Sequence, residues 1–152
     1  KLKLLALLSI IQIVYGAFIA GLKAGRIYNT WPKMGDQWIP ESVYAMSPFW
    51  TNFVEGLAGI QFVHRTLAIA LLLFTIHIFI SCKKFELSLI QKRAMVLLLV
   101  IVIMQMIFGI LTLIMKTPIY LSLTHQLLAF IMLMALILNL YLFKSNSSKT
   151  YQ

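Results

Sequence analysis

The sequence contains few charged residues and very little acid. Only 11% of its 152 residues are charged, and only 4 residues are Asp or Glu, whereas an ordinary soluble domain carries about 25% charged residues. Apolar residues make up 61% of the chain. This composition excludes an ordinary soluble domain and predicts a protein that resides in a lipid bilayer.

Several other features are scarce or absent. The single cysteine, Cys82, allows no internal disulfide, and we expect it to serve packing rather than chemistry. The alternating pattern of membrane β-barrel strands is missing. The sequence also offers no nucleophile with a base, no phosphate loop and no paired carboxylates. We therefore expect no catalytic residue in this chain, and any chemistry would belong to a cofactor.

Long hydrophobic runs dominate what is present. A membrane span takes roughly 20 mostly apolar residues, and backbone polar groups in hydrocarbon must bond within their own segment, so we expect helices. The qualifying stretches are residues 4–22, 56–82, 94–115 and 118–143. The sequence predicts an all-α integral membrane protein, a four-helix up-down bundle forming one domain over residues 1–152, with a long outer loop at 23–55.

Basic residues are distributed unevenly between the two ends of this predicted bundle. A net charge of +9 would suggest nucleic acid in a soluble protein, but these residues lie at helix ends and in loops, so we expect lipid and no nucleic acid as partner. The side with more basic residues faces the cytoplasm. We therefore expect both termini in the cytoplasm, with a bacterial inner membrane preferred over a mitochondrial one. The basic residues on that side are Lys1, Lys3, Lys83, Lys84, Lys92, Arg93, Lys144 and Lys149.

Two of the three histidines form a candidate metal site. Ionisable side chains within membrane spans are functional candidates by default. His64 and His125 lie at nearly the same depth on helices that run in the same direction and face each other across the bundle. Two such imidazoles can bind haem iron as axial ligands. We predict a b-type haem between them; the alternative is that both histidines only bond neighbouring helices.

The residues around this pair have less specific interpretations. Arg65 needs an anion, which haem propionates would supply, or a route to water. Gln61 and Gln126 could orient the ligands or bridge helices. His77 lies about 20 Å deeper than His64, so we expect it to be hydrogen-bonded in the core or near the inner interface. The predicted cofactor-binding set is His64, His125, Arg65, Gln61 and Gln126, with the two histidines as iron ligands.

Several sequence blocks resemble the haem A synthase family, in its mitochondrial and alphaproteobacterial branch. The order and spacing of the blocks agree with that family over about residues 12–135. The blocks are Gly16 to Gly25, Tyr28 to Gly35, Trp38 to Glu41, Gln61 to Arg65, Gln105 to Thr112 and Thr124 to Gln126.

The resemblance implies a function and a partner. Members contain two similar four-helix halves and oxidise a methyl group of haem O to the formyl group of haem A, which terminal oxidases use. This chain resembles the carboxy-terminal half, which holds a b-type haem through histidines that match His64 and His125. In the other half a glutamate stands three residues before the first histidine; here that position is Gln61, which cannot act as a general acid or base.

The resemblance also suggests that the chain is incomplete by itself. It has no initiator Met and enters a hydrophobic helix within three residues, so we expect it to begin inside a longer protein. Its expected partner is the amino-terminal half or a second copy of itself, and the isolated half should be inactive. Two alternatives are a stand-alone bis-histidine cytochrome b for electron transfer and a haem-free assembly scaffold.

Overall fold

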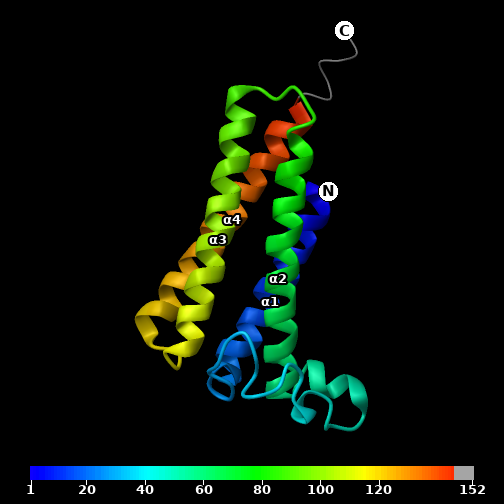
Figure 1. The fold of residues 1–152 in the computed structure, drawn as a ribbon, viewed down its shortest axis with the longest axis vertical. Coiled ribbons are helices and arrows are strands. Elements are labelled where there is room, and N and C mark those ends of the chain that lie inside the picture. Colours follow the sequence, from blue (N-terminus) through cyan, green and yellow to red (C-terminus); the bar gives the residue numbers. More distant parts are fainter. Residues whose placement is uncertain (146–152) are drawn as a thin grey trace.

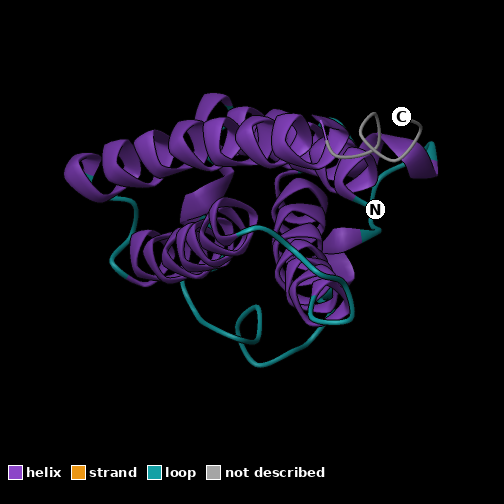
Figure 2. Ribbon diagram, turned by 90° about the horizontal axis from the view of Figure 1, so that it is seen from above, coloured by secondary structure: helices purple, strands orange, loops and turns teal. Residues whose placement is uncertain are grey.

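A computed structural model of the chain describes residues 1–145. Within this range the chain forms helices and loops but no strand (Figures 1 and 2). Residues 146–152, which include Lys149 of the predicted basic tail, lie outside the described part. The four long helices are α1 (Leu2–Gly21), α2 (Leu57–Cys82), α3 (Leu89–Ile114) and α4 (Ile119–Ser145). Each is long and apolar enough to cross a membrane, which confirms the all-α membrane bundle.

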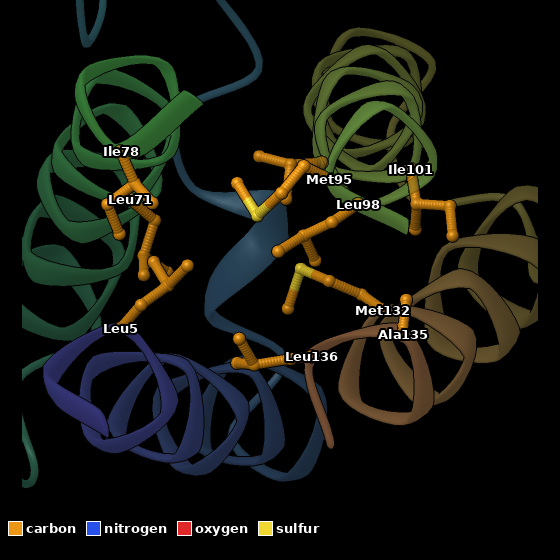
Figure 3. Packing of buried hydrophobic residues seen from close by; sticks show 10 residues of the cluster. Leu5, Leu71, Ile78, Met95, Leu98, Ile101, Met132, Ala135 and Leu136 are labelled. Carbon is orange, nitrogen blue, oxygen red and sulfur yellow. The ribbon is translucent and has the colours of Figure 1, made fainter. Parts of the chain in front are cut away.

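The helices follow one another around the bundle. Each helix packs against the one before and the one after it, and α1 closes the ring against α4. In Figure 3, α2 (green) and α4 (orange-brown) occupy opposite corners. Because successive helices run up and down (Figure 1), α2 and α4 point in the same direction. This is the relationship that the predicted histidine pair requires.

Helix α3 begins five residues earlier than the predicted span at residue 94. The side chain of Ser88 accepts a hydrogen bond from the Gln91 backbone N–H, and the Gln91 side chain accepts one from the Ser88 N–H at 3.0 Å. This reciprocal capping starts the helix. Hydropathy falls at Lys92 and Arg93, so a prediction from hydropathy ends the span there although the helix continues. The other helix ends lie within two residues of the predicted spans.

The connection between α3 and α4 is a tight turn. Lys116 and Thr117 adopt left-handed backbone conformations with φ values of 60° and 59°, and the Thr117 N–H donates to the Thr112 carbonyl at 2.7 Å. Two consecutive left-handed residues reverse the chain over a very short distance. Helices α3 and α4 therefore form the antiparallel hairpin that the sequence predicts.

The main apolar core occupies only the inner half of the bundle, towards the termini. All its members lie closer than His64 and His125 to the end of the bundle that carries the termini, so the two histidines are not part of it. Between the histidines and that end, apolar packing joins the α1–α2 pair to the α3–α4 pair. The buried members are Leu5, Leu71, Ile78, Met95, Leu98, Ile101, Val102, Met132, Ala135 and Leu136 (Figure 3).

The outer loop folds back onto the outer end of α2. Met34 and Val43 of the loop form a second apolar cluster with Ala58 of α2. Asn52 organises the last part of the loop, since its side chain accepts from the Met46 N–H at 2.8 Å and donates to the Met46 carbonyl at 3.0 Å. The loop contains three short 3-10 helices, at Ala24–Arg26, Glu41–Val43 and Phe49–Phe53.

Candidate haem-binding site

His64 of α2 lies against helix α1. The Gln12 side-chain nitrogen lies 3.3 Å from His64 Nε2 and donates to the His64 carbonyl at 3.0 Å. A Cβ placed on Gly16 would lie 3.4 Å from His64 Cε1, so glycine gives the ring room beside the α1 backbone. His64 Nδ1 is buried and has no hydrogen-bond partner among the described residues.

His125 of α4 has the same surroundings on helix α3. The Gln105 side-chain nitrogen lies 3.5 Å from His125 Nε2. A Cβ on Gly109 would lie only 2.9 Å from His125 Cε1, closer than an ordinary contact, so a side chain there would push the ring. His125 Nδ1 is also buried without a partner in the described part of the chain.

The two histidines lie at matching depths on opposite helices. His64 is the eighth residue of α2 and His125 is the seventh residue of α4. Within residues 1–145 no group of three or more His, Cys, Asp or Glu side chains could hold a bare metal ion. A haem iron can take two imidazoles as its axial ligands, and each ring keeps one nitrogen without a partner in the described residues, so the donor set is compatible with a haem.

Arg65 lies next to His64 but holds the outer loop. Its guanidinium donates to the carbonyl oxygens of Thr30 at 3.0 Å and Lys33 at 3.2 Å through one terminal nitrogen, and to that of Tyr28 at 2.7 Å through the other. The Trp31 ring centre lies 5.9 Å from the guanidinium carbon. The terminal N–H groups of Arg65 are thus bonded to the loop, and pairing with haem propionates stays a prediction.

The two glutamines of the predicted set, Gln61 and Gln126, have different surroundings. Gln61 is 1% exposed and donates to the Tyr28 carbonyl at 3.1 Å, so it also fastens the loop. Gln126 is exposed and follows His125 directly, which places it about 100° further round the helix. Their predicted roles as ligand-orienting residues stay untested.

His77 lies near the inner end of the bundle, away from the histidine pair. It is exposed, and its Nε2 lies 3.1 Å from the Lys1 side-chain nitrogen. Its ring stacks on Phe74 with a centroid separation of 6.3 Å. This confirms that His77 is hydrogen-bonded, at the end of the bundle that carries the termini; that this end faces the inner interface stays a prediction.

Sequence reasoning missed Gln12 and the contact of Gln105 with a histidine. A signal was present, because residues 12–16 read Gln-Ile-Val-Tyr-Gly and residues 105–109 read Gln-Met-Ile-Phe-Gly. Residues four apart lie on one face of a helix, so both helices present a glutamine and a glycine together. A search for internal repeats would have paired these segments.

Comparisons with known proteins identify the family of this chain. Residues 2–137 match the COX15-CtaA family, described as cytochrome oxidase assembly protein. The chain is 43% identical over 134 residues to the haem A synthase of Flavobacterium johnsoniae, covering 87% of this chain and 39% of that protein. It is 38% identical over 129 residues to the haem A synthase of Wolbachia sp. subsp. Brugia malayi, covering 85% of this chain and 36% of that protein.

The chain spans less than two fifths of the length of these relatives. No solved structure matches it. The family match covers all but a few residues of the described helical bundle. The chain therefore belongs to the haem A synthase family of cytochrome oxidase assembly proteins.

Proposed function

We propose that this chain is the half of a haem A synthase that holds a b-type haem between His64 and His125. The supporting observation is the matched pair of imidazoles on opposite helices, each with one buried nitrogen that has no partner in the described residues. Small residues behind both rings leave room for them against the neighbouring helices. The named relatives make haem A, so the whole protein would take haem O as substrate and release haem A.

The residues of this chain would bind and orient the haem rather than oxidise the substrate. His64 and His125 would be the axial ligands, and the bound haem would supply one-electron redox chemistry. The side-chain N–H of Gln61 donates to the Tyr28 carbonyl, and an amide cannot act as a general acid or base towards a substrate. Oxidation of haem O would take place in the amino-terminal half, and we expect the isolated chain to be inactive.

The partner and location follow from the same proposal. The amino-terminal half of the synthase, or a second copy of this chain, would pack against the bundle within the bilayer. The excess of basic residues at the end of the bundle that carries the termini supports an orientation with both termini in the cytoplasm. The location that we propose is a bacterial cytoplasmic membrane. The outer loop would then lie on the opposite side, at the level nearest the haem.

The test of the haem site is a reduced-minus-oxidised absorption spectrum. The chain would be purified from haem-replete membranes beside His64→Ala, His125→Ala and His77→Ala variants. We expect a low-spin b-type spectrum that is lost or becomes high-spin in the first two variants and is unchanged in the third. Absence of haem from the unaltered chain, or an unchanged spectrum in both ligand variants, would refute the site.

A second experiment separates the synthase from a stand-alone cytochrome b. The chain would be expressed together with the amino-terminal half of the Flavobacterium johnsoniae relative, and extracted haems would be separated by chromatography. Haem A that disappears in the His64→Ala variant supports the synthase. A b-type haem in the chain without any haem A would favour the cytochrome.

A further inference from the structure

Two glutamines hold equivalent positions beside the two histidines. Gln12 of α1 contacts the imidazole of His64, and Gln105 of α3 contacts that of His125. In each case a glycine four residues further along the same helix lies behind the ring. Helices α1 and α2 thus repeat the arrangement of α3 and α4. The site has an approximate two-fold symmetry, with one histidine and one glutamine from each helix pair.

The polar atoms that have no hydrogen-bond partner are also the same in the Gln12–His64 and Gln105–His125 pairs. The side-chain oxygens of Gln12 and Gln105 are buried without partners within the described part of the chain, as is Nδ1 of each histidine. Buried polar groups are normally paired, and each group left unpaired costs free energy. Each pair thus keeps one glutamine oxygen and one imidazole nitrogen unpaired. This repetition points to a shared role rather than to two unrelated packing defects.

A metal-bound imidazole has a specific requirement that these glutamines can meet. When one ring nitrogen binds iron, the other carries a proton and is normally bonded to a neighbouring group, which fixes the ring plane. A glutamine amide carries a donor and an acceptor side by side, and a half turn about its last bond exchanges them. Gln105 can make this exchange freely, since within residues 1–145 its side chain has no hydrogen-bond partner other than His125.

Gln12 is held more firmly than Gln105. Its amide nitrogen also donates to the carbonyl of His64 at 3.0 Å. With Nδ1 as the iron ligand and the proton on Nε2, the half turn that brings the Gln12 oxygen to the ring gives up this bond in exchange for one from the ring N–H. Gln12 therefore ties α1 to both the backbone and the ring of His64. Rotation of that imidazole about its last bond would break the contact with the amide.

We propose that Gln12 and Gln105 are positioning residues that fix the ring planes of His64 and His125 as haem ligands. This inference rests on the proposed haem site. Loss of groups that orient metal ligands typically lowers metal affinity by about 10–100-fold. Because the two pairs are equivalent, removal of either amide should weaken haem binding and change the relative orientation of the two imidazoles.

The test compares Gln12→Leu and Gln105→Leu with two matched controls. Ser9→Ala on α1 and Thr75→Val on α2 remove buried hydroxyl groups. Among the described residues these hydroxyls bond only carbonyls of their own helices, those of Leu5 and Leu71. The measurements are haem affinity, the midpoint potential and the low-spin EPR spectrum, which reports the angle between the ligand rings. Gln105→Met serves as a second variant if Gln105→Leu does not fold.

We expect each glutamine variant to bind haem about 10–100-fold more weakly and to shift the EPR spectrum and the potential, while both controls match the unaltered chain. Glutamine variants with unaltered affinity, potential and EPR spectrum would overturn the inference and leave the haem site intact. A chain that binds no haem before any substitution would overturn both.

Discussion

Arg65 donates to the backbone carbonyl of Tyr28 over 2.7 Å, so a charged side chain within a membrane helix is hydrogen-bonded by the outer loop. Arg65 is 8% exposed, and a guanidinium in this environment is costly unless its N–H groups are bonded. Backbone carbonyls of the loop accept from both terminal nitrogens. The loop and α2 are therefore coupled directly beside His64.

Replacing this arginine should release the loop. We expect Arg65→Met to lower the free energy of unfolding by about 2 kcal/mol, because three loop carbonyls lose a charged donor. Thermal unfolding in detergent and protease cleavage within residues 23–55 would measure the effect. Arg26→Met is the control, since Arg26 is exposed and its side chain makes a single hydrogen bond within residues 1–145, of 3.4 Å to the Thr117 hydroxyl. Equal stability of the two variants would contradict the coupling.

The close approach of the loop to α2 depends on Gly59. A Cβ at this position would overlap the backbone carbonyl of Asn52, and backbone atoms cannot move aside as a flexible side chain can. We expect Gly59→Ala to cost about 3 kcal/mol or more, measured by thermal unfolding. Gly21→Ala, which meets nothing within 4 Å, should change stability by less than about 1 kcal/mol. Comparable losses in both would rule out the overlap as the cause.

The two glycines behind the histidines should differ in their tolerance of a side chain. A Cβ on Gly109 would lie 2.9 Å from His125, whereas one on Gly16 would lie 3.4 Å from His64. We expect Gly109→Ala to displace the His125 ring and weaken haem binding about tenfold, with Gly16→Ala close to the unaltered chain. Haem titration of both variants measures this. Weaker haem binding by Gly16→Ala than by Gly109→Ala would contradict these distances between the glycines and the rings.

The predicted orientation in the membrane can be tested by cysteine labelling. In a Cys82→Ser background, Asp36→Cys in the outer loop and Lys84→Cys in the α2–α3 loop introduce single exposed thiols. With both termini in the cytoplasm, a membrane-impermeant maleimide added to spheroplasts should label the first variant. The second should react only after the membrane is opened. Labelling in the opposite order would place the termini outside.

The sequence allowed the helices and the histidine pair to be predicted because both depend on regular geometry. Four apolar runs of sufficient length specify membrane helices, and a constant rise per residue places His64 and His125 at the same level. The short connections on both sides of α3 keep it beside α2 and α4, which brings α2 and α4 to opposite corners. None of these steps depends on how an individual side chain packs.

The partners of Arg65 and Gln61 could not be predicted in the same way. Both side chains bond the carbonyl of Tyr28, and every residue of the loop carries a carbonyl group, so the sequence contains no sign of which one is used. The start of α3 at Leu89 was missed for a related reason. Hydropathy marks where a chain enters hydrocarbon, whereas the Ser88 cap marks where the helix begins.

The sequence by itself determined that this is a four-helix membrane protein with two histidines at one depth, because composition and helical spacing are properties of the chain alone. Only the tertiary structure decided that Gln12 and Gln105 contact those histidines, and that Arg65 holds the outer loop. Those contacts join residues of different elements, and their partners depend on the rotation of each helix and the path of the loop. These are fixed only when the whole bundle has packed.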